Sequence, residues 1–460
     1  MTRTRLLLGA CAAAVLLHLL IVASVVRQPL RATAFPEQRS VIWKYHHDTI
    51  HRAGPGSDFF AVYHAAVKLA RGESPYDNKE SPRVTPEFYP FRYLPIVGQT
   101  LGRAATLFEG LTAWRIWCVL LELLLAGTLL VLWRSEPALR WRLGLSAALV
   151  FSSPYFLELH IGQFTFATCA LLAIGLVLLD RSDRSFAPGG TAAFAAAALL
   201  KIFPLAAGAA LIRRRRGFWA AAVAGGLVVL TALPYFLAYP DEWKAFAKVN
   251  FGDTGTEGFH GGNYGFLYMV FLAMKSIGGP AAVKGFLIFA RNWQLVVLGV
   301  TALIVLWKKP SILIGGVTLA CAHMISYKHV WEHHASGAVV LGVFMLVAIR
   351  RQGDRPLFTW LTLGCVIALA LPTPFVLVDT LDPSIYDPTW MWSPFWRFAL
   401  AASKGLPVFV LWVIGAIQCY RHGEAHARPA AGPVADPGPA AVSDGDARDQ
   451  GKSETEPAAT

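Results

Sequence analysis

Long apolar blocks separated by short basic turns recur along this 460-residue chain and limit its fold more than any other feature. A helix that crosses a bilayer needs about 20 mostly apolar residues, and 55% of this chain is hydrophobic while only 15% is charged. We therefore predict an all-α polytopic membrane protein with about 10 full spans. Besides the N-terminal stretch, the predicted crossings are residues 113–133, 142–158, 164–180, 218–237, 292–307, 310–326, 334–350, 357–377 and 398–420.

The two ends of the chain differ in composition. Residues 1–26 hold an apolar run longer than the hydrophobic core of a usual signal peptide, so we expect an uncleaved first span. After Tyr420 the sequence becomes rich in Pro, Ala, Gly and acidic residues, a composition typical of disorder. We expect one transmembrane domain over residues 1–420 and a disordered cytoplasmic tail over residues 421–460.

The basic residues predict how the chain is oriented. The formal charge of +12 comes largely from Lys and Arg in the turns between apolar blocks, and such residues favour the cytoplasmic side. This rule places residues 27–91, with Asp58, at the outer face, together with the polar stretches that begin at His160, Phe259 and Ser326. Nucleotides are absent there, so a reaction at this face would use a donor that is activated inside and carried across on a lipid.

Two apolar blocks do not fit this arrangement as single crossings. Residues 92–111 and 189–212 would each reverse the predicted orientation of everything that follows. Lys201 and Pro204 interrupt the second block, which is typical of two half-spans joined by a non-helical elbow, although a kinked single span remains an alternative. We expect the first block to be a broken segment near the outer interface.

Several polar residues allow both a functional and a structural interpretation. Asp58 precedes an apolar helical pattern and could cap that helix, and Lys201 could line a wet cavity or extend to the interface. His333 and His334 suit phosphate binding, but on a helix they point about 100° apart, so one of them should face the cavity. Gln163 and Asn263, on outer loops, could bind sugar hydroxyls or loop backbone.

The motifs "SDFFAVYHAAVKLARGESPYD", "FRYLP", "HIGQF", "LLKIFPL", "GGNYGF" and "SYKHVWEHH" follow one another over about residues 50 to 350. In this order they resemble glycosyltransferase family 87, which includes polyprenyl-phosphate-mannose-dependent alpha-mannosyltransferases and a related arabinofuranosyltransferase. The resemblance implies a GT-C-type helix bundle. It also implies that Asp58 is the catalytic carboxylate, that the histidine pair and Lys201 contact the donor phosphate, and that Tyr93 contacts substrate. The chain departs from the family pattern in three places: at "YLP", in the residues that follow Gln163, and in the residues that precede the histidine pair.

The resemblance implies a hexosyltransferase, EC 2.4.1.-, of a bacterial-type plasma membrane. It would transfer mannose from polyprenyl phosphate to a lipid or polysaccharide acceptor, with Asp58 as general base, membrane lipids as surroundings and no nucleic acid partner. We expect no cofactor. The predicted outer loops contain no D-x-D pair, so the sequence does not indicate a metal site. A secondary transporter or flippase is the alternative from another class, since these also contain broken helices and buried charges. A ligase or polymerase with a diphosphate-linked donor is a third.

Overall fold

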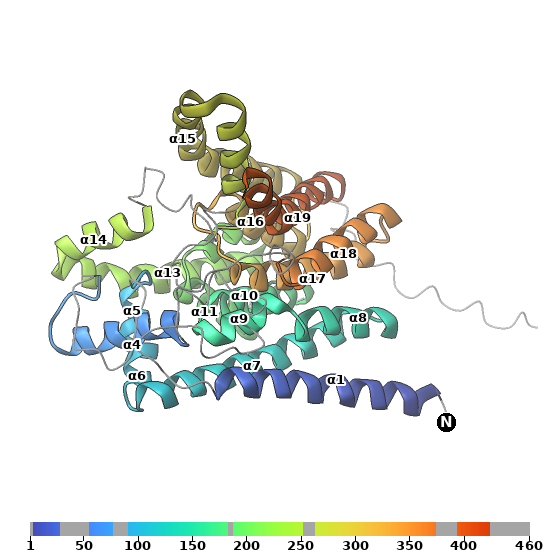
Figure 1. Ribbon diagram of the computed structural model, residues 1–460, viewed down its shortest axis with the longest axis horizontal. Coiled ribbons are helices and arrows are strands. Elements are labelled where there is room, and N and C mark those ends of the chain that lie inside the picture. Colours follow the sequence, from blue (N-terminus) through green and yellow to red (C-terminus); the bar gives the residue numbers. More distant parts are fainter. Residues whose placement is uncertain are drawn as a thin grey trace, which may run out of the picture.

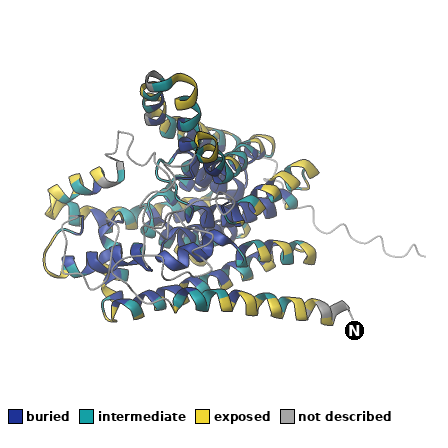
Figure 2. Ribbon diagram, viewed as in Figure 1, coloured by how far each residue is buried: buried dark blue, intermediate teal, exposed yellow. Residues whose placement is uncertain are grey.

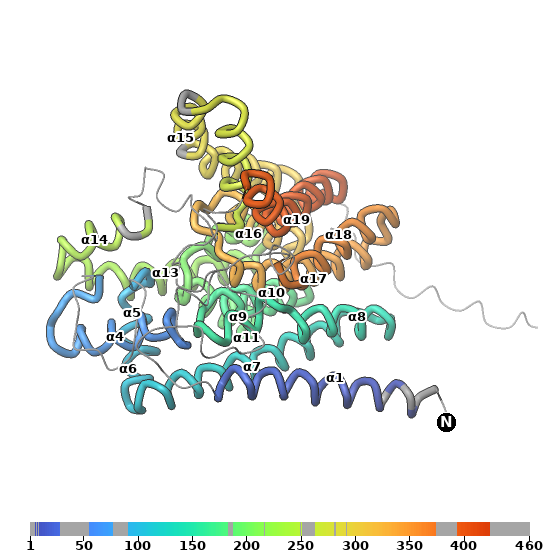
Figure 3. Tube along the Cα trace, in the orientation of Figure 1, coloured from blue at the N-terminus to red at the C-terminus, as the bar shows by residue number. Residues whose placement is uncertain are grey.

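The computed structural model describes residues 3–27, 55–76, 91–182, 187–251, 263–373 and 393–423. Within these ranges every regular element is a helix, and the single isolated bridge pairs Asn263 with Trp331. The predicted disordered tail lies outside the described residues from residue 424 onward. Most of the predicted outer loop, residues 28–54 and 77–90, also lies outside them. The course of the chain runs from the N-terminal helix at the lower edge of the view to the last helix at upper right (Figure 3).

Six helices among the described residues are long and apolar enough to cross a membrane, and four shorter apolar helices accompany them. This confirms an all-α polytopic membrane protein (Figure 1). The six lie in α1 (Arg3–Val26), α7 (Gly110–Ser135), α13 (Arg215–Ala238), α15 (Phe266–Lys308), α17 (His334–Arg351) and α19 (Pro394–Arg421). The shorter ones are α11 (Pro188–Leu200), the first part of α15, α16 (Ile312–Ser326) and α18 (Pro356–Ala370).

Helix α17 lies at the centre of the bundle. Of its residues, 83% are buried, compared with 11% of the apolar stretch of α1, and Figure 2 shows the same contrast. Glycines allow its neighbours to approach closely: a Cβ at Gly337 would meet the Cys169 Sγ of α10 (Thr165–Arg181) at 2.6 Å, and one at Gly342 would meet Val366 of α18 at 2.8 Å. Small residues of this kind are the usual means of close helix packing in membranes.

The basic ends of the helices gather at one end of the bundle. Arg181, at the end of α10, donates to the carbonyl oxygen of Arg134 (3.0 Å), and Arg350 pairs with the buried carboxylate of Glu136 (3.0 Å). Arg214 hydrogen-bonds to carbonyl groups of the turn that follows α15. Because α10 and α17 both finish at this basic end, their first residues, Thr165 and His334, lie at the opposite end.

The block 189–212 is broken at Lys201. Helix α11 ends at Leu200, and Lys201 adopts an extended conformation (φ −144°, ψ 142°). The chain then forms a short 3₁₀ helix, η2 (Phe203–Ala207), and the single turn α12 (Gly208–Leu211). The predicted break of this block at Lys201 is therefore confirmed.

The block 92–111 forms a short helical run in place of a crossing. It consists of α5 (Pro95–Val97), a π-helical turn η1 (Gly98–Gly102) and α6 (Arg103–Ala105). At 1.5 Å per residue this run covers about 16 Å, roughly half of the hydrocarbon core. A Cβ at Gly102 would meet the carbonyl oxygen of Val62 at 2.6 Å, so the run packs closely against the helix that carries Asp58.

The predicted single crossing 142–158 is wrong. The chain forms α8 (Leu139–Val150) and α9 (Ser153–Ile161), with a break at Phe151 and Ser152. Pro154 lies in the first turn of α9, where its missing N–H costs nothing and its fixed φ favours starting a new helix. As a result α9 has its own direction, and its end reaches the candidate site.

The predicted crossing 292–307 is also only part of a longer element. Helix α15 runs from Phe266 to Lys308 with a sharp change of direction at Gly279 (φ 58°, ψ −147°), and part of it reaches away from the bundle (Figure 1). A positive φ is readily adopted by glycine, so Gly279 allows the reversal. A further helix that was not predicted, α14 (Pro240–Phe251), follows α13.

Candidate active site

Asp58 lies in the first turn of α4 (Ser57–Ala70), where Gly56 and not Asp58 is the N-cap residue. Gly56 has φ 76°, and its N–H donates to the carbonyl oxygen of His160 at the end of α9 (2.7 Å). The capping interpretation of Asp58 is therefore wrong. Its Oδ2 is buried and accepts no hydrogen bond from the described residues, so this oxygen remains free to accept a proton or a ligand hydroxyl.

The electrostatic surroundings of Asp58 are suited to a base. Burial raises the pKa of Asp58 from 3.8 to about 7, against the opposing effect of the positive charges on Lys201 and Arg92. Helix α4 is not one of the candidate spans. A carboxylate with a pKa near neutrality is partly ionised at working pH and still binds a proton strongly, which is the compromise that general bases require.

Lys201 reaches the site from the break after α11. Its Nζ donates to the Thr165 hydroxyl (2.7 Å), in the first turn of α10, and the residue is half-buried. The side chain thus turns toward the N-terminus of a helix at the non-basic end of the bundle. Its charge is close enough to act on Asp58.

Gln163 joins three elements of the site. The chain leaves α9 through Gly162 (φ 68°), where a Cβ would meet the Cβ of Phe59 in α4 at 2.5 Å. The Oε1 of Gln163 then accepts from the Tyr93 hydroxyl (2.9 Å) and from the N–H of the following residue (2.7 Å). Its Nε2 lies 3.2 Å from Nε2 of His333. Three predicted site residues therefore form one connected hydrogen-bond network.

This network determines which nitrogen of His333 carries the proton. Both donors to Gln163 meet its Oε1, so its Nε2–H₂ faces His333, and Nε2 of the imidazole must accept. The proton then resides on Nδ1, which is buried and has no partner among the described residues. His333, only 4% exposed, thus holds an unused N–H donor inside the site.

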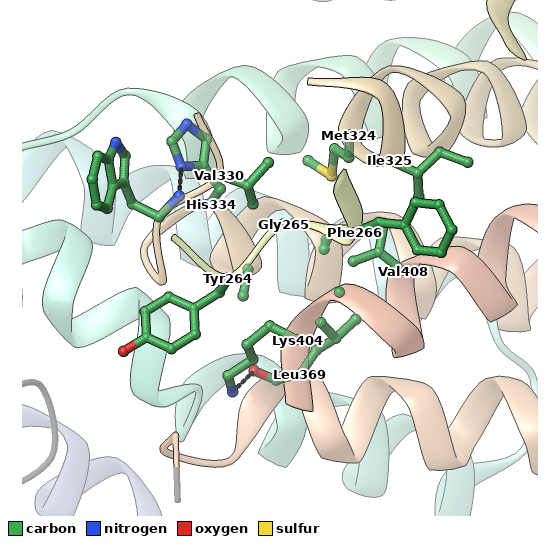
Figure 4. A pocket seen from close by; sticks show the side chains of 14 residues that line it. Tyr264, Gly265, Phe266, Met324, Ile325, Val330, His334, Leu369, Lys404 and Val408 are labelled. Atoms are coloured by element: carbon green, nitrogen blue, oxygen red, sulfur yellow. Dashed lines mark hydrogen bonds between the residues drawn. The ribbon is translucent and has the colours of Figure 1, made fainter. Parts of the chain in front are cut away.

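His334 has different contacts. Its Nδ1 accepts from the backbone N–H of Trp331 (3.0 Å), and its ring lies 4.3 Å from that of His333 between centroids. Figure 4 shows His334 at one side of a small, mostly apolar pocket, with Lys404 at another. The pocket is lined by the start of α15 and the residues just before it, the end of α16 and the segment that follows it, and by α17, α18 and α19; the lining includes Tyr264, Phe266, Met324, Val330 and Val408.

Asn263 uses its side chain to hold the backbone. Its Nδ2 donates to the carbonyl oxygen of Lys328 (2.5 Å), and its Oδ1 accepts from the N–H of Gly265 (2.8 Å). This geometry matches the backbone-bonding alternative for Asn263. It fixes the loop before α15 beside the segment that leads to the histidine pair.

The structure adds polar residues that the sequence interpretation did not select. The positive charge of Arg92 lowers the pKa of Asp58, and the Thr165 hydroxyl accepts from Lys201. Glu158 of α9 is completely buried, near Asp58 and Lys201. A signal existed for Glu158, because a carboxylate inside an apolar block marks a functional position by default. Among the described residues, no group of three or more His, Cys, Asp or Glu side chains is arranged to hold a metal ion.

Comparison with known proteins gives one match. The model of glycosyltransferase family 87 matches residues 88–326, just over half of the chain. The matched range contains Tyr93, Gln163, Lys201 and Asn263, whereas Asp58 and the histidine pair lie outside it. No curated protein and no solved structure matches the chain.

Proposed function

Because this chain belongs to glycosyltransferase family 87, we propose that it transfers mannose from a polyprenyl-phosphate donor to a lipid or polysaccharide acceptor. Family membership and the apolar helices make it a multi-pass membrane glycosyltransferase. Beyond family membership, we propose the polyprenyl-phosphate donor, mannose as the sugar, the acceptor class, a location at the outer face of the plasma membrane, and Asp58 as general base. The observation that carries it is the buried Oδ2 of Asp58, which has no hydrogen-bond partner in the described part of the chain and lies near the charges of Lys201 and Arg92.

In this proposal Asp58 removes the proton from the acceptor hydroxyl as that oxygen attacks the anomeric carbon. The bond between that carbon and the phosphate oxygen breaks, and negative charge develops on the departing polyprenyl phosphate. Lys201 and Arg92 supply positive charge, and Nδ1–H of His333 supplies a donor for the phosphate oxygens. Tyr93 and Gln163, held together by their hydrogen bond, border the space for the sugar.

The position of the site in the bundle supports a lipid-linked sugar donor. The site lies at the end of the bundle opposite the basic helix ends, and basic ends favour the cytoplasm. This supports a site at the outer face, where a sugar must arrive attached to a lipid. The pocket beside His334 is lined mostly by apolar side chains but is only large enough for a water molecule, so the position of the site is what supports a lipid-linked donor.

Vesicles of defined orientation test the outer-face part of this proposal. A short-chain, water-soluble polyprenyl-phosphate mannose added to sealed right-side-out vesicles should be consumed, whereas sealed inverted vesicles should act only after permeabilisation. The Asp58→Asn protein in the same vesicles serves as the blank. Consumption by intact inverted vesicles alone would overturn the outer-face assignment.

The two histidines should respond unequally to alanine. His333→Ala removes the partner of Gln163 and a buried donor that has no partner in the described ranges, so transfer should fall roughly 10- to 100-fold, the equivalent of a hydrogen bond to a charged group. His334→Ala removes mainly the acceptor for the Trp331 N–H, and its loss should be milder. Initial rates at saturating and limiting donor measure both effects. Equal, small losses would remove both histidines from the donor site.

A further inference from the structure

Glu158 joins three helices in the interior of the protein. It is completely buried in α9. Its Oε1 accepts from the N–H of Phe166, in the first turn of α10, and its Oε2 is hydrogen-bonded to the hydroxyl of Ser336, in the first turn of α17. Both carboxyl oxygens are thus hydrogen-bonded to the chain itself, whereas Oδ2 of Asp58 has no such partner among the residues that the structure describes.

Glu158 would be a second buried negative charge near Asp58, and it has no cation paired with it among the described residues. The ammonium group of Lys201 hydrogen-bonds to Thr165, and no ion pair to Glu158 is formed within the described part of the chain. Lys201 acts on both Asp58 and Glu158, and Arg92 acts on Asp58 as well. A buried carboxylate with less positive charge near it retains its proton more strongly, and a buried carboxylate without a paired cation favours the neutral acid.

The hydroxyl of Ser336 connects Glu158 to the backbone of His333. It lies within bonding distance of Oε2 of Glu158 and of the carbonyl oxygen of His333 (2.7 Å for the latter), which also accepts from the Ser336 N–H (3.1 Å). A hydroxyl has one proton to donate and can also accept. An ionised Glu158 would compete with the His333 carbonyl for that one proton. A neutral Glu158 with its proton on Oε2 donates to Ser336 and leaves the hydroxyl proton for His333.

We propose that Glu158 is a positioning residue that acts as a neutral carboxylic acid and holds the start of α17 through Ser336. The backbone of His333 is thereby fixed, and its ring stays beside Gln163 with Nδ1–H directed into the site. Asp58 is left as the one carboxylate that exchanges a proton during turnover. This inference rests on the proposed function for the roles of Asp58 and His333, but the protonation of Glu158 is measurable without any substrate.

Glu158→Gln tests the neutral state directly. The amide keeps an acceptor for Phe166 and a donor for Ser336, so this variant should lose much less than the roughly 10²- to 10⁴-fold that removal of a general base costs. Glu158→Ala removes both contacts and should raise the donor KM more than it lowers kcat, because it releases His333. Ser336→Ala, which breaks only the link to His333, should show the same change in KM. A Glu158→Gln loss as large as that of Asp58→Asn would overturn the proposal.

Infrared spectroscopy of the detergent-solubilised protein gives a readout that does not depend on activity. The C=O stretch of a protonated carboxylic acid should be present in the wild type and in Asp58→Asn at neutral pH, and it should be weaker in Glu158→Gln. An unchanged acid band in Glu158→Gln, or no such band in the wild type, would show that Glu158 is ionised. If instead the acid band behaves as expected but Asp58→Asn transfers sugar normally, the proposed function fails and the inference about Glu158 stands.

Discussion

Asp58→Asn should leave a folded protein that binds its donor but transfers sugar about 10²- to 10⁴-fold more slowly, because an amide cannot accept the acceptor proton. The fold should tolerate the change. Gly56 caps α4, so no capping hydrogen bond is lost, and removing a negative charge near a helix N-terminus costs only about 0.3–1 kcal/mol. Initial transfer rates and donor binding, measured on the same preparation, separate the two effects.

Asp241→Asn is the matched control for this variant. Its carboxylate is 92% exposed in the first turn of α14 and pairs with the neighbouring Lys244, so the same chemical change there should leave transfer unaltered. Asp58→Glu should also be slow, since an added methylene moves the carboxylate by roughly an ångström. Near-normal turnover of Asp58→Asn would remove Asp58 from catalysis.

The rate of the wild-type protein should also depend on pH through this residue. Its pKa, raised to about 7 by burial, means that the carboxylate gains a proton as the pH falls through neutrality, and a protonated carboxyl group is no longer a base. Transfer should therefore decline on the acid side of about pH 7, and this decline should disappear from the residual activity of Asp58→Asn. A flat profile down to pH 5 in the wild type would contradict the role of Asp58 as base.

Lys201→Ala should raise the donor KM and lower kcat, with an overall loss of roughly 10- to 100-fold in kcat/KM. The size corresponds to a hydrogen bond to a charged group, about 1.5–3 kcal/mol. Both parameters should change, because the ammonium would contact the phosphate in the bound donor and would stabilise the greater charge that develops as it departs. Kinetics with varied donor concentration measure the two contributions.

Lys201→Ala should have a second effect on the pH profile. The positive charge of Lys201 lowers the pKa of Asp58, so its removal should raise that pKa and move the acid-side decline to higher pH. Lys244→Ala, with a side chain that is 79% exposed, is the control and should change neither kinetics nor profile. Unchanged kinetics in Lys201→Ala would reduce Lys201 to a structural residue that anchors the start of α10.

Composition and spacing were sufficient to predict the helical fold and one of its irregularities. Lys201 and Pro204 inside an apolar block predicted the break between α11 and η2, because each disfavours a continuous helix in a membrane. The break between α8 and α9 was missed although Pro154 marks it. Apolar content dominated that interpretation, and apolar content does not distinguish one long helix from two short ones.

The site was less predictable than the fold. Resemblance selected Asp58, and charge inside an apolar block selected Lys201, but the network that joins Tyr93, Gln163 and His333 depends on how three distant segments pack. The tautomer of His333 follows from the direction of individual hydrogen bonds, and the role proposed for Glu158 depends on its contacts with α10 and α17. No periodicity or spacing in the sequence encodes these directions.

The most direct test of the account supplies the purified protein, reconstituted in liposomes, with radiolabelled sugar donors one at a time. Polyprenyl-phosphate mannose, polyprenyl-phosphate arabinofuranose and a mannose nucleotide are compared, with Asp58→Asn as the blank. We predict that label moves from polyprenyl-phosphate mannose to a lipid or polysaccharide acceptor only when Asp58 is present. Use of the arabinofuranose donor alone would change the assigned sugar, whereas use of the nucleotide donor, or transfer that does not depend on Asp58, would contradict the central claim.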